Sequence, residues 1–330
     1  RALRLAVKRS VGAYVIVIIS EDEPETLYAA RKGSPLVIGI GDGEHFLASD
    51  ATPIIEYTKK VVYVNDYEVA IVKANELILK NLNNEPQTPF IEQLDLDLST
   101  IEKDGYDHFM LKEIHEQPKT IADCLSGRLN VKSGSVLLGG LVKYEQELKN
   151  ANRIIIVACG TSWHAGLVAE YIIEDLSRIP VEVEYASEFR YRNPVINKGD
   201  VIIAISQSGE TADTLVAIEE AKSKGAIIFG VCNVVGSSIA RLSHDGVYTH
   251  AGTEIGVAST KAFTAQLSVV CLMALKLGFD KGVLAQERYL SLLKELNNIP
   301  QMVERALNQE KKIIKIAQLF KNITSCLFLG

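Results

Sequence analysis

The segment that most constrains the fold is residues 201–218, with the sequence VIIAISQSGETADTLVAI. It has the pattern of an apolar strand, a turn rich in hydroxyl groups and then a helix. In that order, Ser206, Ser208 and Thr211 surround the N-terminus of the helix. Free backbone N–H groups and about half a positive charge at such a terminus favour a phosphate. A phosphorylated small molecule is therefore the first ligand to expect.

The composition is that of an α/β protein with ample core. The chain has 330 residues, of which 47% are hydrophobic and 23% charged, and its length predicts two or three domains. A net charge of −6 gives no basic surface for nucleic acid. The five cysteines are widely spaced without a CxxC pair, which disfavours disulfides and a zinc ribbon and favours a cytoplasmic location. We also expect no membrane partner, because no signal peptide or bilayer-spanning run is evident.

From residue 153 onward, apolar strands alternate with amphipathic helices. The predicted strands are RIIIVA, VEVEYA, VIIAI, AIIFGVC and GVYTHA. This alternation predicts a doubly wound, parallel, five-stranded sheet with helices on both faces. We expect a loop after VEVEYA and helices after the other strands. Ligands of such sheets bind beyond the carboxyl ends of the strands.

The flanking regions have different patterns. Short apolar runs over 11–73 predict antiparallel strands, and the Asn-, Asp-, Glu- and Pro-rich residues 81–104 predict a linker. Pro118 predicts a bend between two helical pieces. The C-terminal segment predicts helices at 287–307 and 310–321 and then a strand, CLFLG. Because the chain starts without methionine and ends in this strand, we expect it to be part of a longer polypeptide.

Three segments at predicted strand ends share one chemical character. They are CGTSWHA (159–165), SQSGET (206–211) and GTEIGVASTKAFT (252–264). Each combines glycine, which lets a ligand approach the backbone, with hydroxyls that donate hydrogen bonds or cap a helix. Capping alone is the alternative for any one segment, but each supplies more hydroxyls than one cap needs. SQSGET contains no cation, so neutral donors would hold the anion.

Other candidate sites are weaker. GIGDGEH (39–45) has Glu44 where a dinucleotide fingerprint needs its third glycine, so we expect a hairpin turn. Cys159 fits a buried hydrophobe better than a nucleophile. His164 has no partner at metal-ligand spacing, so we expect no metal. Lys261 begins a helix, where a cation is unfavourable and a role is conceivable, but the favoured interpretation is a solvated lysine.

Taken together, several motifs resemble the glutamine:fructose-6-phosphate amidotransferase family, the glucosamine-6-phosphate synthases. ACGTSWHA, ASEFRYR, SQSGETADTL, CNVVGSSIAR and AGTEIGVASTKAFTAQ are similar to the first sugar-isomerase (SIS) domain of this family. FMLKEIHEQP and GSPLVIGIGDGEHFLASD resemble its hinge and the later part of its glutaminase domain, an N-terminal nucleophile (Ntn) hydrolase. The resemblance implies four parts: residues 1–80 from the C-terminal part of the glutaminase domain, a linker at 81–104, the first SIS domain with its leading helices at 105–284, and the truncated start of a second SIS domain at 285–330.

The resemblance also implies a substrate, a reaction and a set of binding residues. The family makes glucosamine 6-phosphate from fructose 6-phosphate and glutamine, as glutamine–fructose-6-phosphate transaminase (isomerizing), without a cofactor and as a homodimer. No residue of this chain matches a catalytic residue of the family. The resemblance therefore implies that the chain binds substrate without completing catalysis. The implied fructose 6-phosphate ligands are Cys159, Gly160, Thr161, Ser162, Ser206, Gln207, Ser208, Gly209, Thr211, Val257 and Ser259.

A non-catalytic SIS-domain sensor of sugar phosphates is the alternative, because the SQSGET segment alone does not distinguish the two. The glutaminase-like residues 11–73 and the EIHEQP hinge favour the enzyme. A sensor would be expected to carry a DNA-binding or other output module instead.

Overall fold

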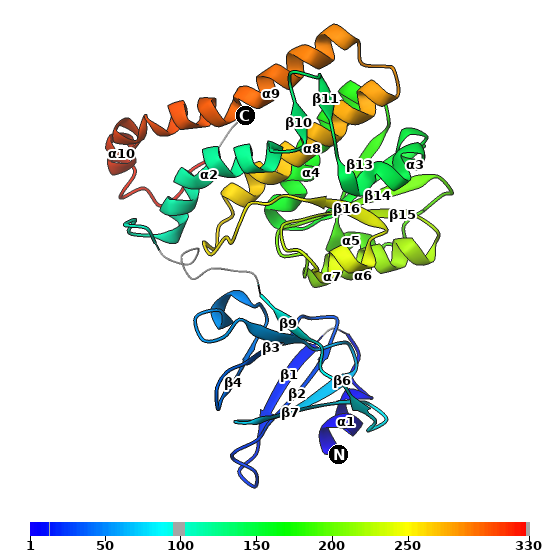
Figure 1. Cartoon of the computed structure of the whole chain (residues 1–330), viewed down its shortest axis with the longest axis vertical. Coiled ribbons are helices and arrows are strands. Elements are labelled where there is room, and N and C mark those ends of the chain that lie inside the picture. The colour runs from blue at the N-terminus through cyan, green and yellow to red at the C-terminus, as the bar shows by residue number, and fades with distance from the viewer. Residues whose placement is uncertain (13, 95–102, 328–330) are drawn as a thin grey trace.

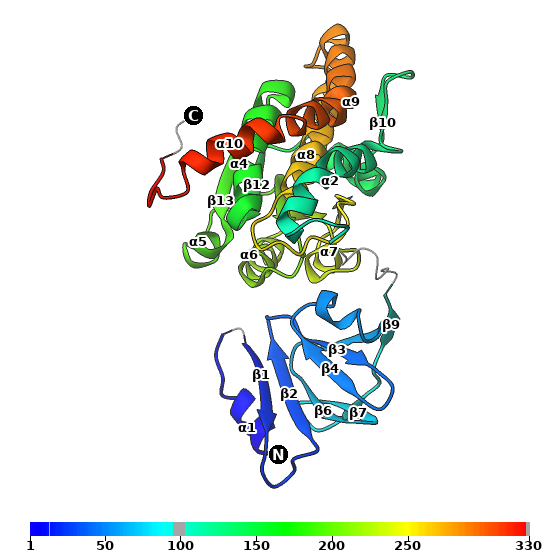
Figure 2. The ribbon, with the colours of Figure 1, turned by 90° about the vertical axis from the view of Figure 1, so that its left-hand side faces the viewer.

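The computed structural model describes residues 1–12, 14–94 and 103–327. An antiparallel region forms the N-terminal part and an α/β region forms the rest (Figure 1). The view in Figure 2, turned by 90°, shows the same two regions one above the other, with the carboxyl edge of the parallel sheet facing the antiparallel region.

The antiparallel region contains two sheets, which confirms the strands predicted over 11–73. One sheet has the order β1-β2-β6-β7-β8 and the other has the order β4-β3-β5-β9. Side chains from both sheets, such as Ile38, Val62 and Val72, share one buried core, so alternating apolar residues explain the packing of sheet on sheet. The elements of this region are α1 (Ala2–Val7), β1 (Tyr14–Ile19), β2 (Leu27–Lys32), β3 (Val37–Ile40), β4 (His45–Ala48), η1 (Thr52–Ile54), β5 (Lys60–Tyr63), β6 (Glu68–Lys73), β7 (Glu76–Asn81), β8 (Pro86–Gln87) and β9 (Ile91–Gln93).

The predicted linker over 81–104 is wrong in its first half. Strand β8 pairs with β7, and β9 pairs with β5, so the chain stays in the two sheets up to Gln93. Residues 95–102 lie outside the described residues. The predicted hairpin at 39–45 is confirmed, because β3 and β4 pair antiparallel around a turn in which Gly43 has φ +74°.

The α/β region is built on the predicted five-stranded parallel sheet, with the order β13-β12-β14-β15-β16. Between β13 and β14 the structure has helix α5 where we expected a loop. The elements of this region up to α8 are α2 (Phe109–Leu125), β10 (Leu129–Asn130), β11 (Ser135–Val136), η3 (Gly139–Tyr144), α3 (Glu145–Lys149), β12 (Arg153–Ala158), α4 (Gly160–Ser177), β13 (Val181–Tyr185), α5 (Ala186–Tyr191), β14 (Asp200–Ser206), α6 (Ala212–Ser223), β15 (Ile227–Cys232), α7 (Ser238–Leu242), β16 (Asp245–Tyr248) and α8 (Lys261–Asp280).

Both faces of the parallel sheet are buried, and the side chains of each strand alternate between them. Ile154 and Ile203 point to the core shared with α4, α8 and α9. Ile155 and Ile202 point to the opposite core, shared with α5, α6 and α7. This burial on two sides explains why the strands are continuous apolar runs. The rigid sheet then fixes the positions of the segments at its carboxyl edge.

Helix α2 is one continuous helix, so the predicted bend at Pro118 is wrong. Pro118 has no N–H to donate to the carbonyl oxygen of Ile114 one turn earlier. The side-chain Nε2 of Gln117 donates to that oxygen at 2.9 Å instead. The lost backbone hydrogen bond is thereby replaced, and the helix runs through the proline.

The C-terminal part of the described chain forms α9 (Gln286–Leu307) and α10 (Glu310–Leu319), as predicted. The described residues of CLFLG form no strand, and residues 328–330 lie outside the described chain. Helix α8 is, by length and composition, apolar enough to cross a membrane, which corrects the expectation that no such segment exists. However, 67% of its apolar window is buried inside the protein, as is typical of a core helix.

Candidate functional site

The three hydroxyl-rich segments lie at one edge of the parallel sheet, as predicted. Strands β12, β14 and β16 run in the same direction, so their carboxyl ends, at Ala158, Ser206 and Tyr248, face the same side. Segments from distant parts of the sequence therefore meet around this edge.

The turn 206–211 has a hydrogen-bonded interior. Ser206 is only 2% exposed, and its Oγ accepts from the N–H of Gly209 at 3.0 Å and lies 2.9 Å from Oγ1 of Thr211. Ser208 Oγ accepts from the N–H of Glu210 at 3.1 Å. Gly209 has φ +67°, and a Cβ there would collide with Ser237 Oγ. Glycine is thus required at this position by both the backbone conformation and the packing.

Thr211 occupies the N-cap position of α6, but its side chain makes no capping hydrogen bond. Its hydroxyl is directed to Ser206 instead. Helix α4 also begins without a side-chain cap, at Cys159. The first N–H groups of an uncapped helix have no intrahelical acceptor. Two helix N-termini at the carboxyl edge therefore offer donors to an anion, which argues against the capping alternative.

The first segment forms the start of helix α4. Helix α4 begins at Gly160, so Thr161 and Ser162 lie in its first turn. Ser162 is buried, and its Oγ accepts from Nε2 of Gln266 on α8 at 3.0 Å. Cys159 is half-buried and precedes the helix. His164 is exposed, and its ring lies against that of Trp163, with the centroids 5.0 Å apart.

The third segment connects β16 to α8 and is held by two carboxylates. Glu254 accepts from Oγ of Ser259 at 2.9 Å and from the N–H of Thr260 at 2.8 Å. Glu113 on α2 accepts from the N–H of Ile255 at 2.6 Å. Val257 is fully exposed, so of the two sugar-pocket residues predicted in this segment, only Ser259 is fixed by a side-chain contact.

Lys261 is not solvated, which corrects that interpretation. Its side chain is only 7% exposed, and Nζ lies 2.6 Å from Oε2 of Glu116 on α2. The carboxylate of Glu116 compensates for the unfavourable position of the cation at the start of α8. The ion pair joins α2 to the N-terminus of α8, beside the third segment.

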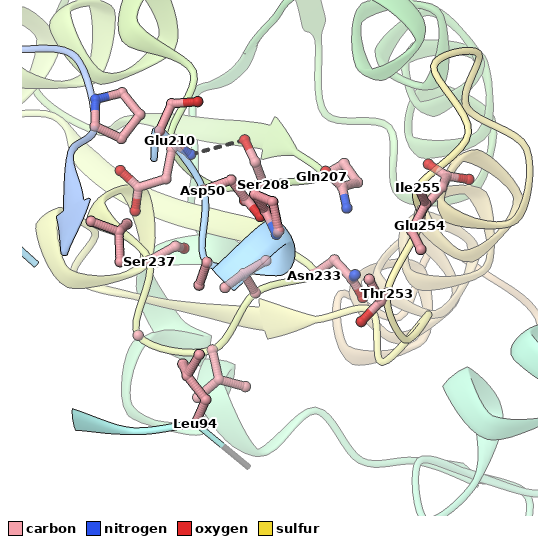
Figure 3. A pocket seen from close by; sticks show the side chains of 18 of the residues that line it. Asp50, Leu94, Gln207, Ser208, Glu210, Asn233, Ser237, Thr253, Glu254 and Ile255 are labelled. Atoms are coloured by element: carbon pink, nitrogen blue, oxygen red, sulfur yellow. Dashed lines mark hydrogen bonds between the residues drawn. The ribbon is translucent and has the colours of Figure 1, made fainter. Parts of the chain in front are cut away.

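A cavity of about 1100 Å³ opens at the carboxyl edge, between the parallel sheet and the antiparallel region. Gln207 and Ser208 line it, while the other predicted ligands are absent from its lining. In Figure 3, Ser208 and Glu210 lie on one side of the cavity, and Glu254 and Ile255 lie on the other. The antiparallel region contributes several residues to the wall, among them Val37, Asp50, Tyr57, Tyr63 and Leu94.

Comparison with known proteins extends the likeness over the whole chain. The sequence profile of the SIS domain matches residues 147–276. The chain is 53% identical over 330 residues to a Bacteroides thetaiotaomicron protein named glutamine–fructose-6-phosphate aminotransferase (isomerizing), covering 100% of this chain and 54% of that protein. A protein of the same name from Chlorobaculum tepidum is 53% identical over 329 residues, covering 100% of this chain and 53% of that protein. The chain belongs to the glutamine–fructose-6-phosphate aminotransferase family.

A solved structure supports the fold within this family. It is the C-terminal domain of glucosamine-fructose-6-phosphate aminotransferase from Francisella tularensis, with a TM-score of 0.64 and 40% identity over 67% of this chain and 62% of that one. The chain spans about half the length of the curated relatives that it matches, 54% and 53% for the two named above.

Asn233 is a residue of the SIS domain whose importance the sequence did not reveal. It follows β15, and its N–H donates to the carbonyl oxygen of Gln207 at 3.1 Å. Its Oδ1 accepts from the N–H of Ala251 at 2.7 Å and its Nδ2 donates to the oxygen of Gly252 at 2.7 Å. Asn233 thus ties the 206–211 turn, through its backbone N–H, to the start of the third segment, through its side chain. Its position one residue beyond a strand end, within the motif CNVVGSSIAR, was the sequence signal available.

Two further ionisable groups at the edge have shifted pKa values. Burial raises the pKa of the Cys232 thiol at the end of β15 to about 12. Burial, with a smaller contribution from the nearby Arg128 guanidinium, lowers the pKa of His250, which lines the cavity. Both shifts favour the uncharged form, so backbone amides and hydroxyls around the 206–211 turn are the donors that this edge offers to an anion.

Proposed function

We propose that this chain is the sugar-phosphate-binding portion of a glutamine–fructose-6-phosphate aminotransferase and that its ligand is fructose 6-phosphate or glucosamine 6-phosphate. The observation that carries the proposal is the uncapped N-terminus of α6, where Thr211 bonds Ser206 rather than the helix. The donors of that terminus remain available to a phosphate, and the bonded hydroxyls hold the turn in a fixed shape. Fixed donors bind a ligand more tightly because less conformational entropy is lost on binding.

The sugar part of the ligand would lie beside the other segments of the edge. In this proposal Ser206, Gln207, Ser208, Gly209 and Thr211 surround the phosphate. The hexose would extend toward the start of α4 and the third segment, whose predicted ligands are Cys159, Gly160, Thr161, Ser162, Val257 and Ser259. Hydroxyl and amide groups are the partners that sugar hydroxyls require.

The proposed domain organisation follows the family. The antiparallel residues 1–80 would be the later part of a glutaminase domain, residues 105–284 the first SIS domain with its leading helices, and residues 285–330 the start of a second SIS domain. Strands β8 and β9 extend the antiparallel unit beyond residue 80, to Gln93. In the whole protein, ammonia from glutamine would aminate fructose 6-phosphate. We also propose a homodimer in the cytoplasm, on the resemblance to the family and, for the location, on cysteine usage.

A non-catalytic sensor of sugar phosphates is less well supported. The relatives match the antiparallel region as well as the SIS domain, since the alignment covers 100% of the chain. A sensor would need only the α/β region and a different output module.

Calorimetric titration of the chain with fructose 6-phosphate tests the proposal. We expect saturable binding that inorganic phosphate competes away, with no binding of unphosphorylated fructose. Ser208→Ala should weaken binding by about 1–3 kcal/mol, because one donor to a charged group is lost. Ser133→Ala is the matched control, since Ser133 is exposed and its Oγ contacts only Ser135 Oγ among the described residues, at 2.7 Å. An unchanged affinity in Ser208→Ala would contradict the assignment of this turn to the phosphate.

A further inference from the structure

We propose that Glu113 on helix α2 is a positioning residue for the sugar half of the site, an inference that rests on the proposed function. Its carboxylate accepts from the backbone amides of Ile255 and Gly256, in the loop that carries Ser259. Glu113 would not touch the ligand itself. It would act by fixing the loop that does.

The Glu113 side chain is bonded to two consecutive amides of this loop. Glu113 is 2% exposed. Its Oε1 accepts from the N–H of Ile255 at 2.6 Å and of Gly256 at 2.9 Å, and its Oε2 lies 3.2 Å from the N–H of Gly256. Hydrogen bonds to an ionised acceptor are about twice as strong as neutral ones. A buried carboxylate also needs such donors, so the contact stabilises both partners.

The helix and the loop approach so closely that a side chain at residue 256 would displace the carboxylate of Glu113. A Cβ at position 256 would collide with Oε2 of Glu113 and would lie 3.4 Å from Cα of Met110. Gly256 therefore lets the loop backbone reach the carboxylate. The contact joins residues 143 positions apart, which is why the sequence pattern does not reveal it.

Glu254 connects the part of the loop that Glu113 holds to Ser259 and to the start of α8. Glu254 Oε2 accepts from Ser259 Oγ at 2.9 Å, and Oε1 accepts from the N–H groups of Thr260 at 2.8 Å and Ala262 at 3.1 Å. Glu254 and Ile255 both line the cavity, opposite Ser208 (Figure 3). Fixing the amide of Ile255 thus fixes the wall of the cavity that faces the 206–211 turn.

Glu113 is separate from the phosphate turn. Among the hydrogen bonds of the described residues, those of its carboxylate go to the third segment. The 206–211 turn is held instead by Ser206, by the N–H of Asn233 and by the N–H groups of Ser238 and Ile239 at the start of α7. Loss of the carboxylate should therefore weaken recognition of the sugar while leaving recognition of the phosphate unchanged. A residue with a merely structural role would affect both equally.

The test compares Glu113→Ala and Glu113→Gln with Lys119→Ala in the full chain. Lys119 is on the same helix, with a side chain that is 81% exposed. In Glu113→Ala we expect faster hydrogen exchange at the amides of Ile255 and Gly256 and about tenfold weaker binding of fructose 6-phosphate. The affinity for inorganic phosphate should stay within about twofold of wild type. A tenfold change in affinity would require the loss of an interaction about as strong as a hydrogen bond, and the substitution removes none from the phosphate turn. Glu113→Gln should be intermediate, because its amide oxygen still accepts.

The outcomes separate this proposal from the proposed function. Unchanged exchange at residues 255 and 256, or equal weakening of fructose 6-phosphate and inorganic phosphate, would overturn the role of Glu113 and leave the proposed function standing. If wild type binds no fructose 6-phosphate, the proposed function fails and this proposal fails with it. If circular dichroism shows that Glu113→Ala does not fold, Glu113→Gln carries the same comparison.

Discussion

Replacing Ser206 with alanine should destabilise the α/β region measurably. The Oγ of Ser206 is buried, accepts from the N–H of Gly209 at 3.0 Å and pairs with Thr211 Oγ1 at 2.9 Å. Alanine fills almost the same volume, so the cost comes from the lost hydrogen bonds. Gly209 is buried too, and its N–H would lose its partner, at a cost of about 1–3 kcal/mol. Thr211 is half-buried, and its hydroxyl can turn toward water.

We therefore expect Ser206→Ala to lower the free energy of unfolding by about 2 kcal/mol. For a cooperative unit of roughly 150–250 residues, that change lowers the Tm by about 4–8 °C. Thermal unfolding followed by circular dichroism measures this, with Ser133→Ala as the control that should change stability by less than about 0.5 kcal/mol. A Tm within about 1 °C of wild type, well below the shift that such a loss implies, would refute the account of a turn fixed by its buried serine.

Three other perturbations test the packing and ionisation described above. Gly278→Ala should destabilise the protein by about 1–3 kcal/mol in chemical denaturation, because the new Cβ would collide with the carbonyl oxygen of Leu176 on α4. Gly139→Ala is the control, because a Cβ there would enter open space. Equal effects of the two substitutions would contradict the close packing of α8. Gln117→Ala should lower the free energy of unfolding by about 1 kcal/mol, because the carbonyl oxygen of Ile114 loses its donor. Adding Pro118→Ala should restore that stability, since alanine supplies a backbone N–H. A double variant as unstable as the single one would argue against the replacement bond. Burial raises the pKa of three thiols, to about 11 for Cys124 and Cys271 and to about 12 for Cys232. The free energy of unfolding should therefore fall as the pH rises above about 9, because the unfolded state then releases thiol protons that the native state retains. If denaturation midpoints at pH 8 and pH 10 are equal, these thiols are not buried as described.

The sequence predicts those features that depend on local pattern and on the direction of strands. Continuous apolar strands alternating with helices predict the parallel sheet. Parallel strands place Ser206 and the start of α4 at one edge, and this inference is confirmed. The hairpin at 39–45 likewise follows from its turn residues. In each case neighbouring residues carry the information.

Features that depend on distant side chains were not predictable in this way. Pro118 indicates a bend by its chemistry, but the neighbouring Gln117 replaces the missing donor. Lys261 was expected to be solvated, because nothing near it in sequence reveals Glu116 on another helix. Strands β8 and β9 are short and polar, so only pairing with β7 and β5 distinguishes them from a linker. Each miss reflects tertiary contacts that override local preference.

The most direct test of the central claim is a calorimetric titration of fructose 6-phosphate into the wild-type chain and the Ser208→Ala variant. The account predicts one saturable site in the wild type, competed by inorganic phosphate, and about 1–3 kcal/mol weaker binding in the variant. Equal affinity in both proteins, or no heat of binding in the wild type at millimolar sugar phosphate, would contradict it.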